Sequence, residues 1–267
     1  MACLSINETT TYRWSFEEDV TEYRAAGVGA IGVWRRKLSD FGEAKGADLL
    51  EEAGLVASCL SWVGGFTGSD GRSYAESLLD AHEALKTAAE INAPTVIVYS
   101  GGRAGHTYNH AKRLIKGALA ELVPQAAEAG ITLAVEPMHP GCADGWTFLT
   151  SLDETLDLLD AIGDDRVKFV FDAYHLGQRP DVLERIERIA SRVALVQLGD
   201  AKKPPDGEQN RCQLGQGVVP LKQIVAALKA GGYDGYYDVE LLGEDVESLD
   251  YRLLIDAAQR AYAELVV

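Results

Sequence analysis

The feature that most constrains the fold is a regular alternation of short apolar runs with longer stretches of helical spacing. The apolar runs are Cys3–Ile6, Ala30–Trp34, Leu55–Trp62, Thr95–Tyr99, Ile131–Glu136, Val167–Asp172, Val193–Leu198 and Gly235–Glu240. Such runs are typical of strands buried on both faces of a parallel sheet. Eight strands that alternate with helices in 267 residues predict a closed (β/α)8 barrel, one domain covering residues 1–267. An open doubly wound sheet is the alternative, but no GxGxxG follows the first run.

The helical stretches have recognisable ends. Ser15 and Glu18 predict a capping box for a helix that stops at Gly27. Leu38–Ala53 is predicted as one continuous helix ended by Gly54. Further helices are predicted at Ser73–Ile91, from Ala111 to a stop at Gly130, after a capping box of Ser151 and Glu154, near Asp181–Ile189, at Leu221–Ala230 with Pro220 at its first position, and at Ser248–Leu265. No linker or low-complexity segment marks a domain boundary.

Composition narrows the class of function. The formal net charge of −16 opposes nucleic-acid binding, which needs a basic surface, but it is compatible with a neutral substrate or a bound cation. The four cysteines are scattered without CxxC spacing, which indicates reduced thiols. No apolar stretch has the length of a membrane span, and the N-terminus lacks the pattern of a signal peptide. We therefore expect a cytoplasmic protein with no membrane partner.

Four of the predicted strands end in a carboxylate or an amide. The run Ile131–Glu136 closes on Glu136, and the three later strands end at Asp172, Gln197 and Glu240. One such acid could simply point into solvent, because an unpaired charge is expensive to bury. In a barrel, however, the active site lies at the carboxyl ends of the strands. Three carboxylates that meet there would repel one another unless a divalent cation lies between them.

Several short motifs resemble one known family. They are Val135-Glu136-Pro137, Phe171-Asp172-Ala-Tyr-His175, Val196-Gln197-Leu-Gly-Asp200, Leu214-Gly215-Gln-Gly217 and Gly232-Tyr-Asp-Gly235 followed by Val239-Glu240. Their order and spacing are similar to those of the sugar phosphate isomerase/epimerase family, in the xylose isomerase-like TIM-barrel superfamily. That superfamily includes ketose 3-epimerases, hydroxypyruvate isomerase, inosose dehydratases, 3-dehydroshikimate dehydratases and endonuclease IV. The resemblance extends over essentially the whole chain and implies a TIM barrel.

The resemblance also implies a metal site. Its ligands would be Glu136, Asp172, Gln197 and Glu240, and the metals usual in the family are Mn²⁺, Mg²⁺ and Co²⁺. Many members have histidine at the third position, where this chain has Gln197. An all-oxygen set of ligands suits Mn²⁺ or Mg²⁺ better than Zn²⁺. The alternative is that Gln197 is no ligand and the metal binds weakly or not at all.

Other residues are candidates for substrate binding. His175 stands in the DxxH pattern whose histidine contacts substrate hydroxyls in the ketose epimerases, and Arg211 resembles an arginine that grips substrate oxygens there. His139 follows Glu136 closely and is expected either to line the pocket or to have no role. Trp34 and Trp62 are expected to stack on an apolar sugar face or to serve only packing. Ser100-Gly101-Gly102 is a weak candidate for close approach of a ligand to the backbone.

These residues together favour proton transfer next to a carbonyl group. Glu136 and Glu240 would act as catalytic base and acid on a small sugar, keto-sugar or polyol-derived ketone, through an enediolate. A metal-dependent dehydratase of a keto-polyol is the alternative, and a non-catalytic barrel is a weaker one. An endonuclease is disfavoured by the charge and by the scarcity of histidines, of which there are five. The family resemblance allows a homodimer or a homotetramer.

Overall fold

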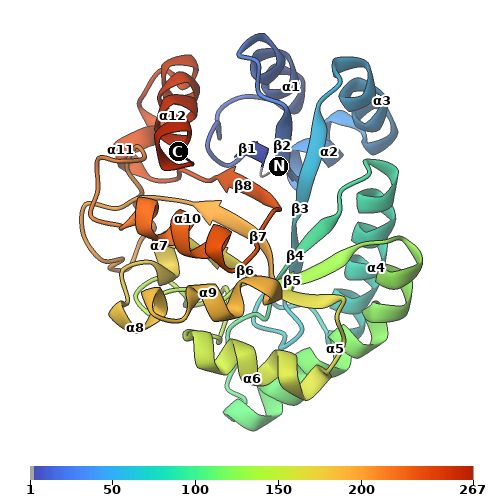
Figure 1. Cartoon of the computed structure of the whole chain (residues 1–267). Helices are drawn as coiled ribbons and strands as arrows, with labels where there is room; N and C mark the ends of the chain where they lie inside the picture. The colour runs from blue at the N-terminus through green and yellow to red at the C-terminus, as the bar shows by residue number, and fades with distance from the viewer. Residues whose placement is uncertain (1–2, 267) are drawn as a thin grey trace.

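The chain forms a closed barrel of eight parallel strands (Figure 1). The computed structural model describes residues 3–266. The strands are β1 (Cys3–Asn7), β2 (Ala30–Trp34), β3 (Val56–Gly64), β4 (Thr95–Tyr99), β5 (Thr132–Val135), β6 (Val167–Asp172), β7 (Val193–Leu198) and β8 (Tyr236–Val239). Each strand pairs with the next along the chain, and β1 closes the barrel on β8 from Cys3–Tyr236 to Ile6–Val239. The predicted TIM barrel is therefore confirmed, and the open sheet is excluded.

Helices between the strands surround the barrel (Figure 1). They are α1 (Phe16–Ala25), α2 (Arg35–Phe41), α3 (Glu43–Ala53), α4 (Tyr74–Glu90), α5 (Tyr108–Glu128), α6 (Leu152–Ile162), α7 (Ala173–Leu176), α8 (Pro180–Leu183), α9 (Ile186–Ile189), α10 (Leu221–Ala230), α11 (Glu244–Glu247) and α12 (Tyr251–Leu265), with a 3-10 turn η1 (Ala190–Arg192). The capping box of Ser15 and Glu18 is present at α1. Among the described residues, no helix is long and apolar enough to cross a membrane.

Four predictions about the helices need correction. The predicted helix Leu38–Ala53 is two helices, because Gly42 has a φ of 109°, outside the helical region, and separates α2 from α3. The segment Asp181–Ile189 likewise divides into α8 and α9. Pro220 caps α10 instead of forming its first residue. The capping box predicted at Ser151 is half formed, since the Glu154 carboxylate accepts the backbone N–H of Thr150.

Strand residues alternate between the barrel interior and the helix layer, as the period of two requires. An interior cluster contains Ile97, Ala134, Val170 and Leu195, whereas neighbours such as Val135 pack in the larger cluster under the helices. Polar groups fill the region near β1, where Asn7 donates to Asp238 at 2.7 Å. Gly32 is required beside this pair, since a Cβ there would lie 2.7 Å from both side chains.

Candidate active site

Because alternate residues of each strand face the barrel interior, the four predicted strand-end residues also point into the barrel. Glu136, Asp172, Gln197 and Glu240 each follow an interior position of their own strand by two residues, and all four are buried. Asp172 and Gln197 are paired in register on β6 and β7. The parallel strands therefore bring these four side chains to the carboxyl end of the barrel, over β5 to β8.

His175 joins this group through one helical turn. Asp172 caps the short helix α7 by accepting the N–H of Tyr174 at 2.7 Å. The turn that follows places His175 Nε2 at 3.6 Å from Asp172 Oδ2 and 3.9 Å from Glu136 Oε1. Glu136, Asp172 and His175 thus each offer one potential ligand atom within 4.8 Å of the others. The DxxH spacing has a simple physical basis here, since residues three apart lie on one helix face.

Arg211 also reaches the carboxylates, although it lies on the long loop between β7 and α10. Its Nη2 donates to Asp172 Oδ2 at 2.7 Å and to Glu240 Oε2 at 3.1 Å. The guanidinium carbon lies 4.3 Å from the centre of the Tyr174 ring, and the backbone N–H donates to Leu242 at 2.8 Å. A fully buried guanidinium therefore bridges two of the four predicted metal ligands.

Burial controls the protonation of the cluster. It raises the pKa of Glu240 to about 7, although Arg211 opposes the shift. Burial also raises the pKa of Glu136 well above its ordinary value, with repulsion from Glu240 and Asp172 in the same direction. The pKa of His175 falls to about 4 because its charged form is desolvated, so the ring is neutral at pH 7. The Glu240 carboxyl is consequently able to exchange a proton near neutrality, and the Glu136 carboxyl keeps its proton to a higher pH than an ordinary glutamate does.

The donor atoms at this site fit a divalent cation. Within the described residues, Glu136 Oε2, His175 Nε2 and both amide atoms of Gln197 are buried without a hydrogen-bond partner. Buried polar atoms are normally satisfied, so such atoms indicate a missing partner. In addition, the guanidinium of Arg211 pairs with only two of the three buried carboxylates, those of Asp172 and Glu240. The donors are oxygens with one imidazole nitrogen, a set that Mn²⁺, Mg²⁺ and Zn²⁺ all accept.

Two weaker candidates lie outside the carboxylate group. His139 is half-buried in the loop after β5, where its Nδ1 accepts the Gly141 N–H at 3.0 Å. The Ser100 hydroxyl accepts the Phe148 N–H at 3.0 Å, and Gly101 donates to Trp146 at 2.9 Å. The structure thus uses the Ser100-Gly101 turn to hold a neighbouring loop.

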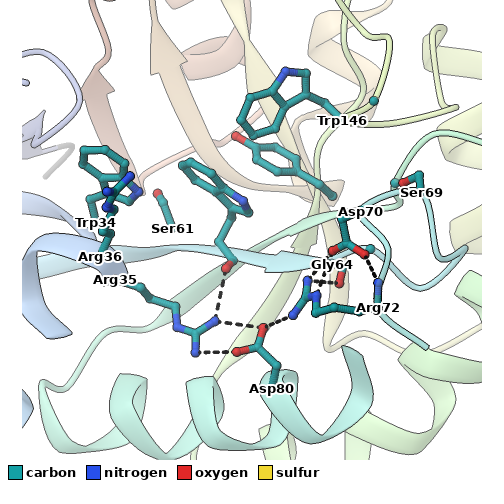
Figure 2. Close-up of a pocket in the computed structure, with 15 residues that line it drawn as sticks. Trp34, Arg35, Arg36, Ser61, Gly64, Ser69, Asp70, Arg72, Asp80 and Trp146 are labelled. Atoms are coloured by element: carbon teal, nitrogen blue, oxygen red, sulfur yellow. Dashed lines mark hydrogen bonds and ion pairs between the residues drawn. The ribbon is translucent and has the colours of Figure 1, made fainter. Parts of the chain in front are cut away.

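A cavity of about 560 Å³ opens over the ends of β2 to β4 (Figure 2). Aromatic rings line it, and one of them, Tyr99, lies near Glu136. Arg35 and Arg72 form its other wall; both pair with Asp80 at 2.9 Å and donate to the Trp62 and Gly64 carbonyls. Tyr99 could have been suspected as the last residue of a buried strand, but no sequence pattern marks Arg72 or Trp146.

A second buried charge cluster lies behind β1 and was not expected from the sequence. Lys37 Nζ lies 2.5 Å from Asp19 Oδ2 and also donates to the Glu8 and Thr11 carbonyls. Glu8 accepts the backbone N–H of Trp34 at 2.7 Å. This cluster therefore holds the strand end that presents Trp34 to the cavity.

Relatives of known name are an isomerase and an epimerase. The chain is 25% identical over 209 residues to an inosose isomerase from Halalkalibacterium halodurans, a match that covers 75% of this chain and 72% of that protein. It is 29% identical over 118 residues to a D-psicose 3-epimerase from Enterocloster bolteae, which covers 44% of this chain and 36% of that protein.

Solved structures share the whole fold. A protein from Sinorhizobium meliloti 1021 superposes with a TM-score of 0.90 and 26% identity, over 98% of both chains. The IolI protein, whose crystal structure contains a zinc atom, superposes with a TM-score of 0.85 and 19% identity over 99% of this chain and 98% of that one. The sequence model of one protein family, the xylose isomerase-like TIM barrel, matches residues 20–264 of this chain. On this match and on the barrel itself, the chain belongs to the xylose isomerase-like TIM-barrel family.

Proposed function

We propose that this protein is a divalent-metal-dependent isomerase or epimerase of a small sugar, keto-sugar or polyol-derived ketone. The observation that carries the proposal is a pair of buried carboxyl groups, Glu136 and Glu240, whose pKa values are raised by burial. The pKa of Glu240, at about 7, suits general acid–base catalysis, since proton transfer is most efficient when the pKa lies near the working pH. The names of the two relatives, an isomerase and an epimerase, support the same class of reaction.

In this proposal the two glutamates move the proton. One removes it from the carbon next to the substrate carbonyl, and the other returns a proton to the enediolate. The face or the carbon that receives the proton decides between epimerisation and 1,2-isomerisation. His175, neutral at pH 7, and Arg211 would hold substrate oxygens, since imidazole and guanidinium N–H groups are hydrogen-bond donors.

The metal would be held by Glu136 and Asp172 together with His175, whose potential ligand atoms lie within 4.8 Å of one another. Gln197 and Glu240, buried at the ends of the next two strands, would complete the set of ligands. When bound, it would supply positive charge that stabilises a substrate oxyanion. The oxygen-rich donor set favours Mn²⁺ or Mg²⁺. Zn²⁺ should also be tested as the bound metal, because His175 offers a nitrogen ligand and the IolI structure contains zinc.

The test is isotope exchange in D₂O. Protein loaded with Mn²⁺, Mg²⁺ or Zn²⁺ is incubated with a panel of ketoses and inososes, and nuclear magnetic resonance follows deuterium at the carbon next to the carbonyl. We expect exchange that falls about 10²–10⁴-fold in Glu136→Gln and Glu240→Gln, variants that keep side-chain size but remove the base. Far-ultraviolet circular dichroism verifies folding. Exchange that persists in both variants, or its absence with every metal and ketone, would overturn the proposal. An absorbing enone product would indicate a dehydratase instead.

A further inference from the structure

Five aromatic rings form a continuous track at the mouth of the barrel: Trp34, Trp62, Tyr99 and Trp146 line the cavity over β2 to β4, and Tyr12 extends the track outside it. Tyr12 stacks on Trp34 at 5.9 Å between ring centres, and Trp34 stacks on Trp62 at 6.1 Å. Trp62 lies 5.3 Å from both Tyr99 and Trp146. The track starts at the surface with Tyr12 and ends at Tyr99, which lies near Glu136. It therefore leads from solvent to a proposed catalytic group.

Packing alone does not explain these rings. Large aromatic side chains stabilise a fold by leaving water, yet Tyr12 is 52% exposed and Trp146 is 40% exposed. Three of the four tryptophans in the chain are in the track, at the end of the barrel that carries the proposed site. Apolar surface gathered at one rim in this way is typical of a ligand site.

The size of the cavity also exceeds the need of a small sugar. The carboxylates lie over β5 to β8, so the reacting end of a substrate belongs there, whereas the cavity of about 560 Å³ lies over β2 to β4. Pockets of about 300–1,000 Å³ are usual for drug-sized ligands. A monosaccharide held at the carboxylates would leave most of this volume filled only by water.

The polar groups of the cavity also indicate which chemical groups a ligand would need. The Ser69 hydroxyl is buried without a hydrogen-bond partner among the described residues. Arg35 and Arg72, fixed by Asp80, stand along one side, below the rings (Figure 2). Flat apolar ring faces with donors at the edge match a ligand ring that has apolar faces and hydroxyl groups at its rim. This is the chemistry of a sugar ring or a hydroxylated aromatic ring.

We propose that the ring track is a subsite for a second ring, so that the substrate is a ring-bearing conjugate of the reacting polyol, such as a glycoside, and not a free monosaccharide. The proposal rests on the proposed function for the location of the reacting end. The conjugate's second ring would stack against the side of the track that faces the cavity, and its hydroxyl groups would bond to Ser69 and the arginines.

Binding without turnover tests this subsite. Metal-loaded protein is titrated by calorimetry with methyl β-glucopyranoside, phenyl β-glucopyranoside and cellobiose, none of which carries a ketone. We expect phenyl glucoside or cellobiose to bind at least about tenfold more tightly than the methyl glycoside, since their second ring adds contact with the aromatic side chains. Quenching of tryptophan fluorescence should accompany that binding. Equal affinities for all three ligands would overturn the proposal.

Substitutions locate the effect. Trp34→Ala and Trp146→Ala should each weaken the tighter ligand about tenfold and leave the methyl glycoside unchanged. Trp34→Tyr, which retains a ring, should restore most of the affinity and excludes misfolding as the cause. Trp14→Phe is the matched control, because Trp14 packs on Tyr251 outside the track. Alanine variants with unaltered selectivity would contradict the subsite, while deuterium exchange on simple ketoses would still report on the proposed function separately.

Discussion

Arg211 is the residue on which the electrostatics of the site depend most. Its guanidinium is buried between Asp172 and Glu240, and no other arginine or lysine among the described residues forms an ion pair with these carboxylates. Breaking a buried pair by removing one partner costs about 3–5 kcal/mol, since the remaining charge stays desolvated. Arg211 therefore stabilises the metal-free barrel as well as serving as a candidate for substrate binding.

The first prediction concerns Arg211→Met. In the presence of EDTA we expect the free energy of unfolding in urea to fall by about 3–5 kcal/mol. Arg252→Met is the control, because the Arg252–Glu22 pair is exposed and should contribute far less. Equal urea midpoints for the two variants would show that the ion pairs of Arg211 do not stabilise the metal-free protein more than an exposed pair does.

The second prediction concerns the choice of metal by Gln197. Gln197→His replaces an amide oxygen with an imidazole nitrogen, which suits zinc. We expect the affinity for Zn²⁺ relative to Mn²⁺ to rise by about tenfold or more, measured by competition calorimetry. Gln216→His, at an exposed loop position, is the control. An unchanged ratio would remove Gln197 from the set of proposed ligands.

The third prediction concerns Glu8. Burial, followed by repulsion from Asp19, raises the pKa of the Glu8 carboxyl well above its ordinary value. The folded state then keeps a proton that the unfolded state releases, so the contribution of Glu8 to stability is present below the unfolded pKa and is lost as pH rises toward the folded one. Relative to Glu8→Gln, the wild-type protein should lose unfolding free energy from about pH 5 upward, measured by urea denaturation. If the unfolding free energies of the wild-type protein and Glu8→Gln changed in parallel with pH, the prediction would be wrong.

At the scale of elements, the junctions at the two ends of α2 help to position the side chains of Trp34 and Arg35 beside the cavity. Arg35 begins α2 directly after Trp34, and its pairing with Asp80 ties this junction to α4. Gly42 then ends α2, so that α3 can pack against α1 as a separate helix. The break at Gly42 is thus part of the architecture around Trp34, one of the residues of the ring track.

The fourth prediction follows from Gly42. Its φ of 109° lies where side chains other than glycine are strained, so Gly42→Ala should lower the free energy of unfolding by about 1–3 kcal/mol. Gly29→Ala is the matched control, because a Cβ at Gly29 meets no atom within 4 Å and its φ is not in that region. Thermal denaturation of the two variants distinguishes them. Indistinguishable midpoints would mean that the junction between α2 and α3 relaxes freely around the added methyl group.

At the scale of the whole molecule, the barrel brings four strands together around excess negative charge. The fifth prediction is that a divalent cation at 100 times its Kd raises the free energy of unfolding by about 2.7 kcal/mol, as expected for a ligand that binds only the folded state. Urea titrations with and without Mn²⁺ measure this, and Asp172→Asn should abolish most of the gain. A gain that survives in Asp172→Asn would place the cation elsewhere.

Much of the fold was predictable because its signals are local. Strand and helix segments follow from hydrophobic periodicity, and their alternation fixes the barrel and the end at which Glu136, Asp172, Gln197 and Glu240 emerge. The interior direction of these side chains follows from the period of two along a strand. The split at Gly42 was not predictable, because the apolar spacing continues across it and only the backbone angle shows the break.

The sequence by itself therefore determined the order of elements, the barrel and the strand-end candidates. The tertiary structure alone decided which charges meet: Arg211 with Asp172 and Glu240, Arg35 and Arg72 on Asp80, and Lys37 on Asp19. It also decided that Trp146 joins Trp34 and Trp62 in one track. These partners lie on different loops and strands, and their meeting depends on loop conformations that no local pattern encodes.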